Sequence, residues 1–360
     1  MRIALVSAYP IGFNPGMLSV DLAWDEIFAA NNSDAQHSYT RFNFQRAADF
    51  ADANGELAVL LESSDQLNDF DRVVYWGDFL QWQSWYQNDL TSRNNNMGLG
   101  KTPEQVLDAC FDVFLLENNP ELQAKVVIFG STLVGVTAQQ LQDDRYRNAL
   151  VSLISNARMV RFRDVYSTNF ANLLVPTARA SLGCDAALLS SPQSLNFEVP
   201  EYAVYSFGRS GRPNDSRELA VELGRQAGIP VVDADWLGCS GPQSLQQKLA
   251  LVRGAKWVFT DVYHLSVTAI REGIPVALLG KGVERTERTI SDKKKETLFT
   301  QYLLNDWYFF VESSLDGLDR QEAAKHVVWR VYQREEFAAA RRMVLAQTRA
   351  LRAEIEAVLF

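Results

Sequence analysis

The chain has 360 residues, more than one hydrophobic core usually serves, so the length predicts two domains. With 47% hydrophobic and 22% charged residues, the composition is that of a globular protein and excludes extensive disorder. The formal net charge of −9 lacks the basic character of nucleic-acid-binding proteins, so we expect no nucleic-acid partner.

The first half of the chain alternates short apolar runs with segments of helical period. The predicted strands are 3–6, 73–76, 126–129 and 159–162, and the predicted helices are 18–30, 138–156 and 167–174. A Gly/Pro turn at 12–16 connects the first strand to the first helix, and another apolar run covers 186–189. The Ser/Pro-rich segment that follows predicts an interdomain linker over 191–200.

The same alternation starts again after the linker. Strands are predicted at 202–207, 230–233, 257–260, 275–279 and 307–311, and helices at 214–226, 242–253, 264–271 and 292–304. From residue 321 to the end the pattern is helical, with Phe337, Met343, Leu345 and Leu351 spaced for one buried face.

Strand–helix alternation in both halves predicts parallel sheets covered by helices on both faces. We therefore predict an α/β fold of two Rossmann-like domains that face each other across a cleft, with a long C-terminal helix. The predicted boundaries are 1–190 for the first domain, expected to be the acceptor-binding side, and 201–335 for the second, expected to be the donor-binding side. The C-terminal helix is predicted over 336–360.

Three cysteines and three histidines are present, in no C-x-x-C pair and with no zinc-ligand spacing. This pattern favours a reducing compartment, hence a cytoplasmic location, and predicts no metal centre. No run approaches the roughly 20 apolar residues of a membrane span, so membrane contact, where it occurs, is expected to be peripheral. The sequence leaves a homo-oligomer open.

Thr260-Asp261-Val262-Tyr263-His264 is the strongest candidate for a functional segment. In doubly wound sheets ligands bind where strands end and helices begin, and His264 is predicted to lie in the first turn of such a helix. There an imidazole can exchange a proton near neutral pH. The competing interpretation is a histidine that is hydrogen-bonded within the fold.

Two further segments offer cations to an anionic ligand. Arg163 follows a predicted strand and can clamp a carboxylate or phosphate, or else form an ion pair with Asp164 or another acid. Arg209 lies in Gly208-Arg209-Ser210-Gly211-Arg212, a glycine-containing loop that is not a P-loop because it lacks the G-K-[ST] ending.

An aromatic cluster follows the strand at 73–76 and includes Trp76, Trp82 and Trp85, with Asp78 among them. Aromatic rings can bind sugar faces, and Asp78 can accept a hydroxyl proton. Aromatic side chains also build cores, and that alternative stays open.

Three segments together resemble the polysaccharide pyruvyltransferase family. Arg163-Asp164-Val165-Tyr166-Ser167 is similar to the family's Arg-Glu-x-x-Ser segment, and Asp185-Ala186-Ala187-Leu188-Leu189 to its Asp-Pro-Ala-x-Leu segment. Residues 244–280 resemble its most characteristic stretch, which here closes with Gly273-Ile274-Pro275-Val276. The family's arginine before the histidine is replaced by Val262, and its leucine by Tyr263.

The resemblance implies a GT-B type fold and transfer of a pyruvyl group from phosphoenolpyruvate to a sugar or lipid-linked glycan, with phosphoenolpyruvate as co-substrate and no cofactor. It implies His264 as the acid and Asp78 as the base. Donor contacts are expected from Arg163, Arg209, Lys281 and Tyr263, and acceptor contacts from the three tryptophans Trp76, Trp82 and Trp85.

Two other functions stay open. A nucleotide-sugar glycosyltransferase shares the expected fold and does not need an arginine at position 262. A family member without activity, serving as a binding subunit in glycan assembly, also agrees with Val262.

Overall fold

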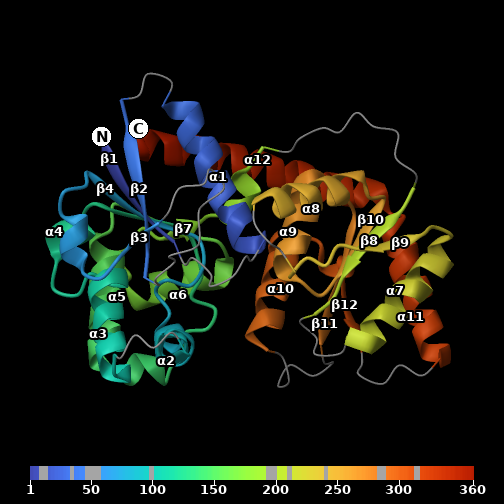
Figure 1. Cartoon of the computed structure of the whole chain (residues 1–360), viewed down its shortest axis with the longest axis horizontal. Helices are drawn as coiled ribbons and strands as arrows, with labels where there is room; N and C mark the ends of the chain where they lie inside the picture. The colour runs from blue at the N-terminus through green and yellow to red at the C-terminus, as the bar shows by residue number, and fades with distance from the viewer. Residues whose placement is uncertain are drawn as a thin grey trace. The chain divides into compact units, whose positions relative to one another are not determined.

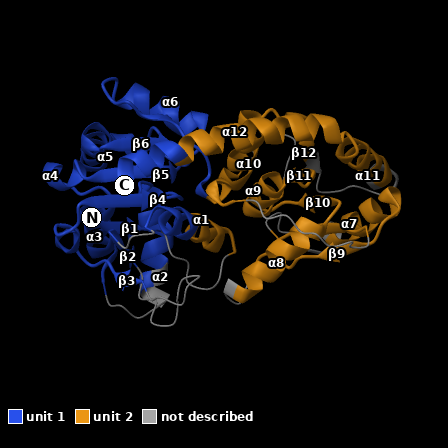
Figure 2. Cartoon of the chain, turned by 90° about the horizontal axis from the view of Figure 1, so that it is seen from above, with its two compact units in different colours: residues 1–11, 24–186, 353–360 blue, residues 12–23, 187–352 orange. Residues whose placement is uncertain are grey.

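The computed structural model describes residues 1–7, 15–32, 36–44, 58–96, 101–191, 201–208, 213–238, 242–281, 289–311 and 317–360. The chain divides into two compact units (Figures 1 and 2). Unit 1 holds residues 1–11, 24–186 and 353–360, and unit 2 holds residues 12–23 and 187–352. Of the predicted linker, only Ser191 is among the described residues.

Unit 1 is built on one parallel sheet. Its described strands have the order β3-β2-β1-β4-β5-β6-β7. They are β1 (Arg2–Val6), β2 (Ser38–Asn43), β3 (Val59–Leu60), β4 (Arg72–Trp76), β5 (Val126–Ser131), β6 (Met159–Phe162) and β7 (Ser181–Leu182). Every residue of β5 is buried, as expected for a parallel strand covered on both faces.

The α-helices that accompany this sheet lie in the connections between its strands. They are α1 (Pro15–Asn31), α2 (Thr91–Asn96), α3 (Pro103–Phe114), α4 (Pro120–Gln123), α5 (Asp144–Asn156) and α6 (Val165–Leu174). Helices α2, α3 and α4 all lie between β4 and β5. The sequence placed the start of the α5 helix at residue 138, which is too early. Asp143 ends the preceding loop because its side chain accepts hydrogen bonds from the backbone N–H groups of Arg145 and Tyr146.

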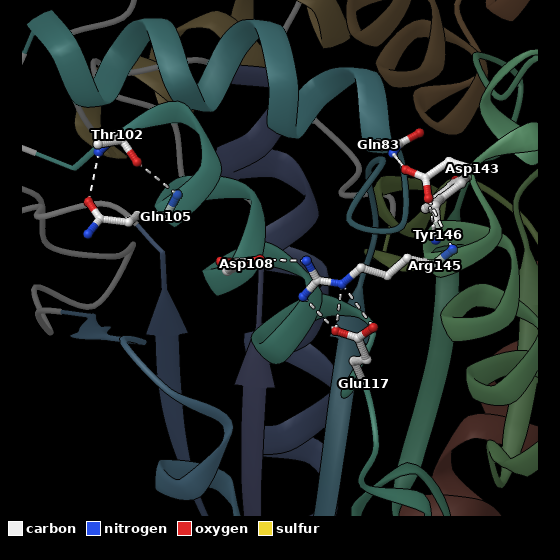
Figure 3. A network of polar contacts seen from close by, with 8 residues as sticks. All are labelled: Gln83, Thr102, Gln105, Asp108, Glu117, Asp143, Arg145 and Tyr146. Atoms are coloured by element: carbon white, nitrogen blue, oxygen red, sulfur yellow. Dashed lines mark hydrogen bonds and ion pairs between the residues drawn. The ribbon is translucent and has the colours of Figure 1, made fainter.

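A polar network joins α3, α5 and the segment after β4 (Figure 3). Arg145 donates to both oxygens of Glu117 at 2.9 and 3.0 Å and also pairs with Asp108. These bonds raise the pKa of Arg145, above all through Glu117. Gln83 donates to Asp143 at 2.6 Å, and the Tyr146 hydroxyl donates to the Gln81 carbonyl at 2.8 Å. The network therefore holds the loop after β4 against α5.

Unit 2 has its own parallel sheet, with the described strands in the order β12-β11-β10-β8-β9. They are β8 (Ala203–Ser206), β9 (Val231–Asp233), β10 (Trp257–Thr260), β11 (Val276–Lys281) and β12 (Tyr308–Val311). The helices are α7 (Pro213–Ala227), α8 (Pro242–Gly254), α9 (Tyr263–Glu272), α10 (Ile290–Gln301), α11 (Gly317–Val331) and α12 (Arg334–Leu359), whose residues from 353 on belong to unit 1.

A buried ion cluster lies where α9 ends. Glu272 accepts from Arg271 at 2.7 Å and lies 3.1 Å from Arg253, and the side chains of Glu272 and Arg271 are each 1% exposed. Arg271 also donates to the Ala187 carbonyl at 3.2 Å. Because two guanidinium groups share one carboxylate, this cluster depends on Glu272.

The buried face of the C-terminal helix α12 differs from the predicted one. Phe337 and Leu351 are buried as predicted, but Met343 is 37% exposed and Val344 is buried instead. The buried stripe continues through Thr348 and Ile355, at spacings of three and four residues.

Candidate functional site

In unit 2, side chains at the ends of β8 and β10 connect the two neighbouring strands. Thr260 and Ser206 are paired residues, and the Thr260 hydroxyl donates to the Ser206 carbonyl at 2.6 Å. The Gly208 N–H donates to both carboxylate oxygens of Asp261, at 3.0 and 3.3 Å. Both Thr260 and Asp261 are buried, so the loops that follow these strands start from a fixed geometry.

The segment that follows β9 is hydrogen-bonded to the end of β8. The N–H of Trp236 donates to the Ser206 hydroxyl at 3.0 Å, and the N–H of Ala234 donates to the Tyr205 carbonyl at 2.8 Å. Partial burial and then the nearby Asp233 carboxylate raise the pKa of Tyr205. Ser206 and Trp236 could not be predicted, because nothing near them in the sequence indicates that their partners come from distant segments.

Helix α9 begins without a side-chain cap. Its N-cap residue is Val262, which has no oxygen to accept from the N–H groups of the first turn. The Val262 N–H itself donates to the Thr260 hydroxyl at 2.9 Å. By contrast, Asp164 caps α6 and Thr289 caps α10. The start of α9 therefore presents the positive end of a helix dipole, which suits an anionic group.

His264 lies in this first turn, as the sequence predicted, and it packs against the start of α1. A Cβ atom added at Gly16 would lie 2.5 Å from His264 Cγ and 2.8 Å from its Cβ, so the imidazole fits only beside a glycine. The ring also meets Tyr263 edge-on, with centroids 5.0 Å apart. Gly16 belongs to the Gly/Pro turn of the sequence, and its close approach to His264 explains why that turn ends in glycine.

Two predicted donor contacts lie partly or wholly outside the described residues. Arg209 lies outside them, and only Gly208 of its loop is described. The backbone of Lys281 ends β11, but its side chain is not described.

Arg163 occupies a buried position in unit 1. Its guanidinium Nη1 lies 3.3 Å from Asp185 Oδ2, and the two side chains are 5% and 1% exposed. The sequence left an ion pair open as the alternative to an anion clamp, and the ion pair is present with Asp185 as the acid. It joins two of the three segments that resemble the pyruvyltransferase family.

Asp164, next to this pair, organises a second polar group. Its carboxylate accepts from the Ser167 N–H at 2.7 Å, the Ser167 hydroxyl at 2.9 Å and the Thr132 hydroxyl at 2.7 Å. The Leu133 N–H donates to the Ser167 hydroxyl at 2.7 Å. Asp164 and Ser167 thus cap α6 and anchor the loop after β5, which gives the Asp-x-x-Ser pattern a structural role.

The predicted acceptor residues lie after β4. Trp76 is fully buried and stacks on Phe129, with ring centroids 5.2 Å apart. Trp85 is 8% exposed and donates to Asp89 at 2.9 Å. Trp82 is partly exposed and packs against Gly135, where any Cβ would collide with its ring.

Asp78, the predicted base, is 7% exposed and has a left-handed backbone with φ of 56°. Its carbonyl accepts from the Thr132 N–H at 2.8 Å, which connects the loops after β4 and β5. A non-glycine residue with positive φ carries backbone strain, and such strain is concentrated at functional sites.

Within the described ranges, no group of three or more His, Cys, Asp and Glu side chains is arranged to hold a metal ion. None of the helices in the described part of the chain is long and apolar enough to cross a membrane.

Comparison with family models and with curated protein sequences finds no match. Solved structures do match. UGT89C1 of Arabidopsis thaliana, complexed with quercetin, is 10% identical, aligns over 99% of this chain and 98% of its own, and has a TM-score of 0.51. The spinosyn rhamnosyltransferase SpnG is 15% identical over 99% and 100% (TM-score 0.45), and S. aureus MnaA with UDP is 10% identical over 93% and 91% (TM-score 0.48).

These identities establish the fold and nothing finer. The chain has an α/β fold of the GT-B type, with one parallel Rossmann-like sheet in each of its two units. The predicted fold class is thereby confirmed.

Proposed function

We propose that the chain is a glycosyltransferase-like enzyme that uses a nucleoside-diphosphate sugar as donor, with the donor diphosphate bound at the start of α9. The observation that carries this proposal is the first turn of α9 after β10, which has no side-chain cap at Val262, carries the positive end of the helix dipole and contains His264. The GT-B type of fold supports it, because ligands of doubly wound sheets bind at the carboxyl ends of strands.

Each residue has a definite part in this proposal. Thr260 and Asp261 position the ends of β10 and β8, and the positive end of α9 attracts the diphosphate. His264, beside that anion, donates a hydrogen bond or a proton to it as charge develops on the leaving group. A sugar or lipid-linked glycan is the acceptor, and Trp82 and Asp78 remain its proposed contacts.

Substituting Val262 by Thr tests the anion site directly. Threonine has nearly the shape of valine, but its hydroxyl can accept from the N–H groups that the diphosphate would need. A cap bond is worth about 1 kcal/mol, so the Kd for the nucleotide sugar should rise about fivefold, while the free energy of unfolding stays the same or increases. Titration calorimetry measures the Kd, and an unchanged Kd would argue against binding at α9.

Pyruvyl transfer from phosphoenolpyruvate is a second candidate, favoured by one observation. Arg163 and Asp185, from two segments that resemble the pyruvyltransferases, form an ion pair although they are 22 positions apart in the chain. In this reaction the carboxylate and phosphate of the donor would need cations, and Arg163, Arg209 and Lys281 are the proposed sources. Val262, at the position of the family's arginine, favours the nucleotide sugar.

A donor screen separates the two reactions. Turnover of a nucleotide sugar in the presence of a sugar acceptor supports glycosyl transfer, whereas phosphate release from phosphoenolpyruvate supports pyruvyl transfer. The His264→Ala variant, checked for folding by thermal unfolding, should lose most of the turnover in either case. Donor binding without turnover in the unaltered protein would instead indicate the binding subunit.

A further inference from the structure

The amino-terminal edge of the unit 1 sheet carries a row of basic residues, one for each of five neighbouring strands. The strands β1, β4, β5, β6 and β7 are adjacent in this order. The basic row consists of Arg2 and Arg72, which begin β1 and β4, Lys125 and Arg158, which directly precede β5 and β6, and Arg179, two residues before β7. With neighbouring strands about 4.8 Å apart, the row extends over roughly 19 Å.

The residues of the basic row form no ion pair with any carboxylate in the described ranges. Lys125 donates to the Asn68 carbonyl at 2.8 Å, and the Arg2 guanidinium lies 5.1 Å from the centre of the Phe70 ring. Arg72 donates to the backbone carbonyl of Asp71 at 2.8 Å. Within the described part of the chain, no carboxylate therefore neutralises the charges of the row directly.

Several acidic residues lie in the connections that lead to β4 and β5, and those nearest in sequence to the starts of these strands are Asp69, Asp71 and Glu121. At Arg72, Asp71 does not outweigh the neighbouring positive charge. Burial and then the charge of Arg158 lower the pKa of Arg72, and the repulsion from Arg158 has a larger effect than the attraction of Asp71. The arrangement stands out in a chain whose net charge is −9.

An exposed apolar helix end lies beside this row. Helix α6 follows β6 and returns to the amino-terminal edge, where the connection that contains Arg179 leads into β7. Leu173 in its last turn is 81% exposed, and α6 contains no charged residue. Figure 2 shows α6 along the margin of unit 1, beyond β5 and β6. The apolar surface of a leucine this exposed stays in contact with water, and burying that surface against a partner would be favourable.

We propose that the basic row and Leu173 form a docking surface for an anionic lipid bilayer. The cations would contact lipid phosphates, and Leu173 would enter the boundary between headgroups and acyl chains. An aliphatic side chain next to unpaired cations suits a bilayer better than a nucleic acid, because nucleic-acid surfaces favour aromatic stacking and phosphate contacts. The proposal is independent of the reaction that the protein catalyses.

Vesicle co-sedimentation with the full chain tests this surface. Vesicles of phosphatidylcholine with one-fifth phosphatidylglycerol should bind the protein at low salt, and pure phosphatidylcholine vesicles should not. The double variant Arg158→Gln/Arg179→Gln should lower the affinity about 25-fold, at about fivefold per lost cation. Leu173→Ser should reduce the binding that remains at high salt, where charge attraction is screened.

The matched control is Arg342→Gln/Arg349→Gln, which removes two exposed arginines of α12 and changes the net charge equally. It should bind anionic vesicles like the unaltered protein, and thermal unfolding confirms that all variants fold. Equal loss in both double variants, equal binding to the neutral vesicles, or no binding to anionic vesicles would overturn the proposal. It would also be overturned if single-stranded DNA bound as tightly as vesicles and independently of Leu173.

Discussion

Replacing Gly16 by alanine should displace His264, and a double-mutant cycle can measure this effect. The added methyl carbon would lie 2.5 Å from His264 Cγ, about 1 Å inside ordinary van der Waals contact, so the imidazole or the start of α1 must move. Overpacking of this kind costs about 1–3 kcal/mol, partly offset by the better helix propensity of alanine, up to about 1 kcal/mol. We therefore expect the Gly16→Ala variant to be destabilised by about 1–2 kcal/mol.

The His264→Ala background provides the decisive comparison. Without the imidazole the new methyl group has room, so Gly16→Ala should there be neutral or slightly stabilising, and the coupling energy should be about 1–3 kcal/mol. Urea unfolding of the four proteins gives the coupling energy. If His264 is the catalytic acid, a displacement of 1 Å should also reduce kcat by up to about 100-fold. Equal destabilisation in both backgrounds would refute the contact between Gly16 and His264.

Two further predictions concern buried groups. Glu272→Ala should lower the free energy of unfolding by about 3–5 kcal/mol, because it removes the carboxylate that the buried Arg271 shares with the part-buried Arg253. Glu322→Ala, in an exposed ion pair, should cost less than about 1 kcal/mol. Urea unfolding compares the two variants, and equal losses would contradict the reasoning. Burial raises the pKa of the Cys184 thiol, so this thiol should not be alkylated at pH 8 while the protein is folded. Peptide mass spectrometry after alkylation measures this, and rapid labelling of the native protein at Cys184 would contradict the prediction.

Most of the strands could be predicted because parallel strands buried on both faces appear as short continuous apolar runs. The predicted strand 257–260 coincides with β10, and 73–76 differs from β4 by one residue. By contrast, β2 was missed because Ser38–Asn43 contains a central arginine, which is typical of an exposed segment. In the fold Arg41 is buried and pairs with Asp25 at 2.9 Å, a partner that local sequence does not reveal.

Helix α3 was missed although the sequence contains its start signal. The Thr102 hydroxyl accepts from the Gln105 N–H, and the Gln105 side chain accepts from the Thr102 N–H, which forms a capping box. Pro103 occupies the first helical position, which proline favours. A search for capping boxes, in addition to apolar periodicity, would have found this helix.

The candidate site shows where sequence reasoning stops. His264 was identified because it follows a recognisable strand, a relation that extends over only a few residues. The groups that fix the end of that strand are Ser206 and Gly208, 54 and 53 residues before their partners Thr260 and Asp261. Because such pairs form only when β8 and β10 lie side by side, one sequence can indicate the reactive side chain but not its support. The absence of a side-chain cap at Val262 indicates a ligand site only because Val262 is the N-cap of α9. The same valine inside a helix would indicate nothing about a ligand, so the boundary of α9 had to be known first.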